Sequence, residues 1–277
     1  MGTPAVPWTE IRPTTGLLGG LSVREVWSFR EVAWMLAFRE LKVRYKQTAL
    51  GVLWVVIQPL AGVALFTLVF GKLAGLPSDG MPYPLFVFAG LILWGYFAAS
   101  AERATQSLVD DRELITKVFF PRLLAPAAAL LPRLIDLVIS LGVIAVAAAL
   151  YGVAPGPEVV LVPVWIAGTV IVTFGAGLLF SALNVRYRDV GNAIGLLLQL
   201  WMFASPVVFA SSSVHGWLRT VMSLNPLTGL LDGFRWSLLA APAPPGVDLL
   251  SLAGAALLCT GGLVYFQRSE RRFADLI

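Results

Sequence analysis

Six stretches of this chain are apolar enough to cross a lipid bilayer as helices, and they constrain its fold more than any other feature. A membrane-spanning helix needs about 20 mostly apolar residues, and backbone polar groups inside a bilayer must find their hydrogen bonds within the segment itself. We therefore predict an all-α integral membrane protein with six transmembrane helices. The six stretches are Leu53–Phe70, Leu85–Ser100, Ala127–Leu150, Val159–Leu183, Ala193–Ala210 and Leu249–Phe266.

The composition excludes a soluble domain. Charged residues make up 13% of the chain, and the mean hydropathy is +0.81, whereas soluble domains carry about 25% charged residues. The net charge of +4 is divided along the chain, and no basic run is long enough to follow a nucleic acid, so we expect no nucleic-acid partner. The single cysteine, Cys259, excludes a disulfide within one chain.

Lysine and arginine gather on one side of the predicted spans. Sixteen of the 20 lie before the first span, in the connections after spans two and four, or after the last span, and only three lie in the opposite connections. Cytoplasmic loops carry an excess of Lys and Arg. Both termini are therefore predicted to be cytoplasmic.

The chain before the first span divides into two parts. Residues 1–20 lack the basic start and apolar core of a signal peptide, and we expect a flexible cytoplasmic tail. Residues 21–47 are too charged to span but form an amphipathic pattern, which favours a helix lying in the membrane interface, either as an anchor or as a lever touching a partner. Residues 48–277 then form the six-span domain. The apolar stripe of the interface helix consists of Trp27, Trp34, Phe38, Leu41 and Tyr45.

The connection after span two reads VDDRELITKVFFPRLLAP at residues 109–126 and crowds mixed charges between two apolar stretches. Because proline disfavours helical geometry at the residue before it, we predict a short cytoplasmic helix at about 105–120 that ends near Pro121. We expect Leu108, Ile115 and Val118 to pack inward. The side chains expected to face water or a partner are Asp111, Arg112 and Lys117.

Seven motifs together resemble the transmembrane subunit of ATP-binding-cassette exporters of polysaccharides such as O-antigen, teichoic acid, capsule and galactan. The resemblance covers residue 25 to the end of the sequence. The motifs are RELKVRYKQTALGVLW (39–54), QPL (58–60), ELITKVFFPRLLAP (113–126), SALNVRYRDVGN (181–192), SPVVF (205–209), NPLTGLLDGFR (225–235) and FADLI (273–277).

The resemblance implies a homodimer of six-helix subunits, two separate ATPase subunits, and a lipid-linked glycan as substrate in a bacterial cytoplasmic membrane. The chain contains no G-x-x-x-x-G-K-[ST] phosphate-binding loop. The ATP and Mg²⁺ would therefore be bound by the partner ATPase, and we expect this chain to have no cofactor and no enzymatic activity of its own. His215 lacks other ligand-type neighbours, so we predict no metal site.

By the same resemblance, the charged connection is a coupling helix that sits in a cleft of the ATPase, and the turn at residues 186–189 lies near it. An ordinary solvated helix is the alternative, and the positive-inside rule alone explains the two arginines of the turn. The candidates for ATPase contact are Asp111, Arg112, Glu113, Lys117, Phe119, Phe120, Pro121, Arg122, Arg186, Arg188 and Asp189.

Aromatic and polar side chains within the spans are candidates for a glycan channel, because sugar rings stack on aromatic faces; packing within the bundle or against lipid is the alternative. Arg133 and Asp136 are three residues apart on one helical face, and we interpret them as a structural pair. The channel candidates are Trp54, Gln58, Phe66, Phe88, Trp94, Tyr96, Trp201 and Phe203.

The connection between spans five and six is too short to span twice, and the resemblance implies two re-entrant outer gate helices at about 212–240. The gate candidates are Asn225, Pro226, Phe234 and Arg235. The sequence departs from the family pattern at Leu123, where an acidic or small residue is frequent, and at Phe209, where tyrosine is common. Two alternatives stay open: an exporter of a small lipid or drug, and a partner-free channel or membrane scaffold.

Overall fold

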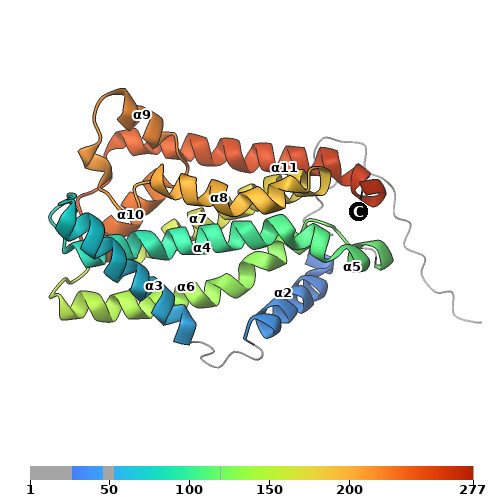
Figure 1. Ribbon diagram of the computed structural model, residues 1–277, viewed down its shortest axis with the longest axis horizontal. Coiled ribbons are helices and arrows are strands. Elements are labelled where there is room, and N and C mark those ends of the chain that lie inside the picture. Colours follow the sequence, from blue (N-terminus) through green and yellow to red (C-terminus); the bar gives the residue numbers. More distant parts are fainter. Residues whose placement is uncertain (1–26, 46–52, 119, 277) are drawn as a thin grey trace, which may run out of the picture.

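The computed structural model describes residues 27–45, 53–118 and 120–276, and every regular element in those ranges is helical. Figure 1 shows an elongated bundle with its long helices along the long axis, α9 and α10 at one end, and α2, α5 and the C-terminus at the other. We call these the α9 end and the α5 end. The predicted tail at 1–20, the start of the interface helix at 21–26 and Phe119 lie outside the described residues.

Five helical segments are long and apolar enough to cross a membrane, and they match five of the six predicted spans. The second and the fifth of these segments extend well beyond the predicted ends at the α5 end, because charged turns continue the apolar helices there. The segments are Leu53–Leu73 (α3, Leu53–Phe66, with the π-helix η1, Thr67–Leu73), Tyr83–Asp110 (α4), Leu124–Leu150 (α6), Pro157–Arg186 (the 3₁₀ helix η2, Pro157–Leu161, with α7, Val162–Arg186) and Gly246–Glu270 (the 3₁₀ helix η4, Gly246–Leu249, with most of α11, Leu250–Leu276).

The fifth predicted span, Ala193–Ala210, is wrong at both ends. The corresponding helix α8 runs from Asp189 to Phe203 and has 15 residues. Its length of about 22 Å at ~1.5 Å per residue is less than the ~30 Å of a bilayer core. The chain leaves the helix at Ala204, and residues 204–209 form turns and bends. A sixth spanning helix is therefore not confirmed.

Helix α4 is the centre of the bundle. It packs against α6 and α7 on two sides and contacts α3, α8 and α10 as well. In the most apolar window of α4, 72% of the residues are buried, compared with 6% for α3. Small residues such as Ala101 and Ala104 permit these close contacts, while Phe97 fills the space between α4 and α8 through an edge-to-face contact with Trp201. The site residues on α4 are thus held rigidly from several sides.

Helix α2 (Arg30–Tyr45) packs on α6. Leu36 and Ala37 are buried against the bundle, together with neighbouring apolar side chains. The predicted stripe lies elsewhere on the helix surface, since Trp27, Trp34 and Phe38 are exposed. The element therefore has one apolar face packed on the chain and a second one directed away from it.

The short helices differ in part from expectation. Helix α5 spans only Arg112–Lys117, because residues 105–110 belong to α4 and the backbone breaks at Asp111. Between α8 and α11, the predicted pair of short helices is present as α9 (Trp217–Ser223) and α10 (Thr228–Leu239), after a 3₁₀ turn η3 (Ser211–Ser213). Each is too short to span a bilayer.

Candidate coupling surface and membrane cavity

The outer surface of α5 carries mixed charges. Arg112, Glu113 and Lys117 are exposed, and the Lys117 ammonium lies 3.5 Å from the Glu113 carboxylate one turn away. Leu108 and Ile115 are buried as predicted, whereas Val118 is exposed, contrary to prediction. The α5 end therefore presents a short charged ridge on an apolar base.

Asp111 does not face water. Its side chain is 7% exposed, and its carboxylate accepts a hydrogen bond from Arg39 of α2. This bond raises the pKa of the Arg39 guanidinium above its already high ordinary value. Asp111 therefore fixes α2 to the start of α5, and the expectation that it faces a partner is wrong for its carboxylate.

A second ion pair ties α2 to α4. Arg103 donates from Nε and Nη2 to the two carboxylate oxygens of Glu40, at 2.8 and 2.6 Å, and also bonds Asp110. Burial alone would raise the pKa of the Glu40 carboxyl, but the hydrogen bonds and charge of Arg103 hold it below its ordinary value. A paired, two-point contact of this kind fixes orientation as well as distance. Neither Glu40 nor Arg103 was among the residues predicted from the sequence.

The segment after α5 is anchored to the C-terminal helix. Phe120 is buried, and Arg122 donates to the backbone carbonyl of Glu270. Phe266 and Phe273 of α11 pack edge to face at 5.4 Å in the same apolar cluster. Part of the FADLI motif thus serves as an anchor for the α5 end, and Phe120 and Arg122 contribute to positioning within the chain.

The turn between α7 and α8 is exposed at Arg186, Arg188 and Asp189. Asn184, which is buried, holds this turn in place. Its side-chain nitrogen donates to the carbonyl of Thr105 on α4 at 3.0 Å, and its oxygen accepts from the backbone N–H of Gly191 at 2.8 Å. The turn is therefore attached to the helix that continues into α5.

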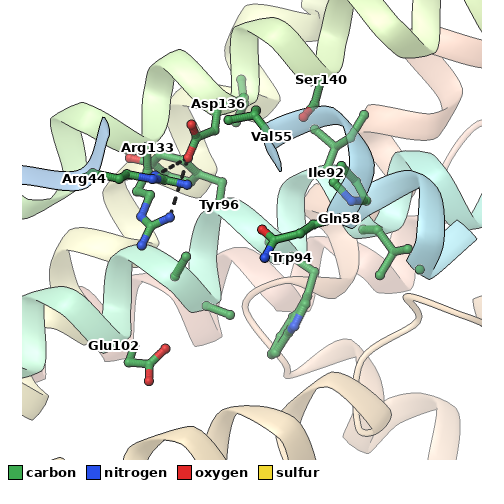
Figure 2. A pocket seen from close by; sticks show the side chains of 17 residues that line it. Arg44, Val55, Gln58, Ile92, Trp94, Tyr96, Glu102, Arg133, Asp136 and Ser140 are labelled. Carbon is green, nitrogen blue, oxygen red and sulfur yellow. Dashed lines mark hydrogen bonds and ion pairs between the residues drawn. The ribbon is translucent and has the colours of Figure 1, made fainter. Parts of the chain in front are cut away.

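A cavity of about 420 Å³ lies between the end of α2 and helices α3, α4 and α6. Figure 2 shows Arg44 and Arg133 converging on Asp136, with Gln58 across the cavity. Arg44 bonds Asp136 Oδ2, and Arg133 Nη1 lies 3.6 Å from the same oxygen. The predicted Arg133–Asp136 pair is confirmed, and the structure adds a third member from α2.

The predicted channel candidates divide into three groups. Gln58, Trp94 and Tyr96 line this cavity. Phe88 is buried in the main core, Trp201 packs on Phe97, and Phe66 stacks on Phe70. Trp54 and Phe203 are exposed on the outside of this chain. A single channel lining is not assembled from these residues within one copy of the chain.

Asn225 fastens the connection after α9 to the end of α8. Its side-chain oxygen accepts from Trp201 Nε1 at 3.2 Å and from the backbone N–H of Leu227, and its nitrogen donates to Ser205 Oγ at 2.8 Å. Pro226 follows and is buried. Where α8 ends, its last polar groups lose their partners within the helix, and buried polar groups in proteins are almost always hydrogen-bonded. Asn225 supplies hydrogen bonds at this point.

Arg235 of α10 is 2% exposed and lies between three segments. It donates to the carbonyls of Pro206 and Val207 at 2.7 and 2.8 Å and to that of Phe86 at 3.2 Å. Asp232, one turn earlier, faces it at 3.5 Å and accepts from Ser211. Arg235 and the fully buried Phe234 thus anchor α10 inside the bundle. Within the part of the chain that the structure describes, no group of three or more His, Cys, Asp or Glu side chains is placed to hold a metal ion.

Comparison with known proteins identifies relatives over most of this length. Residues 31–239 match the family model described as ABC-2 type transporter. The chain is 32% identical to the O-antigen export system permease protein RfbA of Myxococcus xanthus over 263 residues, which cover 92% of this chain and 98% of the relative.

Two further relatives are more distant. The O-antigen export system permease protein RfbA of Klebsiella pneumoniae is 28% identical over 86% of this chain and 92% of its own length. The polysialic acid transport protein KpsM of Escherichia coli is 24% identical over 85% of this chain and 92% of its own length.

Proposed function

The chain belongs to the ABC-2 type transporter family of multi-pass membrane proteins, and from that premise we propose that it is the permease subunit of an ATP-driven exporter of a lipid-linked polysaccharide. The substrate would be O-antigen, teichoic acid, galactan or a similar glycan. Support for this substrate class comes from relatives named for O-antigen export and polysialic acid transport that align over almost their whole length.

The observation that carries the proposal is the α5 end. Two exposed charged segments, α5 and the turn at 186–189, lie at the same end of the bundle and are attached to one helix, α4. By the positive-inside rule this end is cytoplasmic. Here the exposed charges Arg112, Glu113 and Lys117 form the contact with a separate ATPase, which binds ATP and Mg²⁺.

The active unit is a homodimer with two ATPase subunits. Helix α3 is the least buried of the five spanning segments, and α8 directs Leu196, Leu200 and Phe203 away from the bundle. A second copy covers these apolar faces, so that the exposed rings of Trp54 and Phe203 lie beside the substrate path between the copies. The re-entrant pair α9 and α10 closes that path on the outer side.

Depletion of this chain from its host tests the proposal. We expect a lipid-linked glycan to accumulate on the cytoplasmic side and its surface form to disappear. Accumulation of an unglycosylated lipid would instead indicate a small-lipid exporter, and normal surface glycan would contradict the proposal.

Copurification tests the ATPase contact. The double charge reversal Glu113→Lys with Lys117→Glu should lower the amount of ATPase recovered with the chain, while Lys72→Glu at the opposite end should not change it. Equal recovery from both variants would contradict the assignment of α5.

A further inference from the structure

The cavity between α2, α3, α4 and α6 has a graded lining. Its charged residues Arg44, Arg133 and Asp136 lie toward the α5 end, while Gly62, Leu91 and Ser140 lie toward the middle of the bundle. Along α6, the seven residue-to-residue steps from Arg133 to Ser140 span about 10 Å at ~1.5 Å per residue. The volume of about 420 Å³ lies within the ~300–1,000 Å³ range of small-molecule sites. This shape and gradient suit an amphipathic ligand.

The charged end of the cavity holds two cations on one carboxylate oxygen. Arg44 and Arg133 both approach Asp136 Oδ2, so the cluster carries more positive than negative charge. Glu102 also lines the cavity, but it is exposed and stands apart from the cluster in Figure 2. Guanidinium groups present planar sets of donors that match phosphate oxygens. The cluster therefore favours a phosphate-bearing ligand.

Arg44 and Arg133 also form part of a second, neighbouring cavity of about 570 Å³. That cavity is lined mainly by charged side chains, among them Arg39, Glu40 and Arg103. The two arginines thus stand between an apolar cavity and a polar one. A phosphate held by them would have an apolar chain on one side and a polar substituent on the other.

We propose that this cavity binds the phosphate head of a membrane lipid, with the phosphate on Arg44 and Arg133 and the first part of the lipid chain against Val55, Pro59 and Leu91. Identification of this lipid as the phosphorylated carrier of the exported glycan rests on the proposed function. The site itself does not, because any lipid phosphate of the bilayer has the same chemistry.

Binding to the purified full-length chain in nanodiscs of neutral lipid tests the site. The three ligands are a long-chain polyprenyl phosphate, phosphatidylglycerol and inorganic phosphate, each measured by native mass spectrometry or equilibrium titration. We expect Arg133→Gln to weaken lipid binding at least tenfold, because it removes the excess positive charge of the cluster. Asp136 keeps Arg44 as its partner in this variant, so no carboxylate is left unbalanced. Arg44→Lys should weaken binding less, and Lys42→Gln, an exposed cation on the same helix, should change it less than twofold.

Each outcome decides the site. Loss of polyprenyl phosphate binding in Arg133→Gln supports the site and the carrier as its ligand; loss of phosphatidylglycerol binding alone supports the site with a bilayer phospholipid as its ligand. Unchanged lipid binding in Arg133→Gln overturns the proposal, as does equally tight binding of inorganic phosphate. The binding measurement needs neither an ATPase nor transport. Lipid binding that depends on the arginines would therefore support the site even if the depletion experiment contradicted the proposed function.

Discussion

The guanidinium carbon of Arg235 lies 3.7 Å from the centroid of the Phe86 ring, at the α9 end of the bundle. The same side chain donates to three backbone carbonyls from two other segments. A buried cation with this many partners joins α10, the start of α4 and the irregular segment after α8. One side chain from a distant part of the sequence thus bonds the backbone carbonyls that follow the early end of α8.

Replacement of Arg235 by Met should destabilise the chain strongly. The substitution leaves three carbonyls without their donor and Asp232 without its cation, and removing one partner of a buried pair costs about 3–5 kcal/mol. Denaturant unfolding in detergent measures the loss. Lys72→Met, which removes an exposed cation at the same end, should change stability by less than about 0.5 kcal/mol. Equal stability of the two variants would contradict the anchoring role.

Gly90→Ala should disturb the same contacts of Arg235 from the side of α4. A methyl group at Gly90 would lie 2.5 Å from Arg235 Nη2 and 2.6 Å from the carbonyl oxygen of Val207. Overpacking of this kind costs about 1–3 kcal/mol. In Gly142→Ala nothing lies within 4 Å of the added carbon, so this control should be neutral or more stable, as alanine favours helix. Thermal unfolding followed by tryptophan fluorescence distinguishes the two, and a neutral Gly90→Ala would show that Arg235 moves freely.

Asn184→Ala should loosen the turn between α7 and α8. The substitution removes the acceptor for the N–H of Gly191 and the donor to Thr105, and losing a bond at a helix N-terminus costs about 0.5–2 kcal/mol. Hydrogen exchange at residues 186–191 should increase, whereas Asn192→Ala, on the exposed surface of α8, should leave it unchanged. Exchange that is equal in both variants would argue against the attachment to α4.

The Glu40–Arg103 contact should show coupling in a double-mutant cycle. With Glu40→Gln and Arg103→Gln, we expect a coupling energy of about 1–3 kcal/mol in unfolding, because the pair is two-point and half-buried. The exposed pair Glu113–Lys117 should give about 0.3–0.5 kcal/mol in the same experiment. A Glu40–Arg103 coupling as small as that of the exposed pair would mean that α2 is held by its apolar face alone.

Hydropathy was sufficient to predict the helical class and five spans, because each of those spans is a nearly continuous apolar run. Hydropathy failed at α8 for a physical reason, because the turn at 204–209 is as apolar as the helix before it. The helix stops there because Asn225 and Arg235, which are distant in sequence, satisfy the backbone carbonyls of the turn. Local pattern contains no information about such partners.

The predicted coupling residues show the same limit. Charge on α5 identified Arg112 and Lys117 correctly as exposed, but it could not separate them from Asp111, whose partner Arg39 lies 72 residues away. The Arg133–Asp136 pair was found from its spacing of three residues, whereas Arg44, 92 residues from Asp136, was not. Spacing predicts contacts within a helix and leaves contacts between helices undetermined.

On the proposed function, the 15 residues of α8 also bear on the wall that the exported glycan would pass. The helix of about 22 Å is roughly one quarter shorter than a bilayer core of ~30 Å, and the apolar turn at 204–209 continues it. If two copies face one another along α8, the path between them would therefore be lined by helix over most of its height and by irregular backbone at the α9 end.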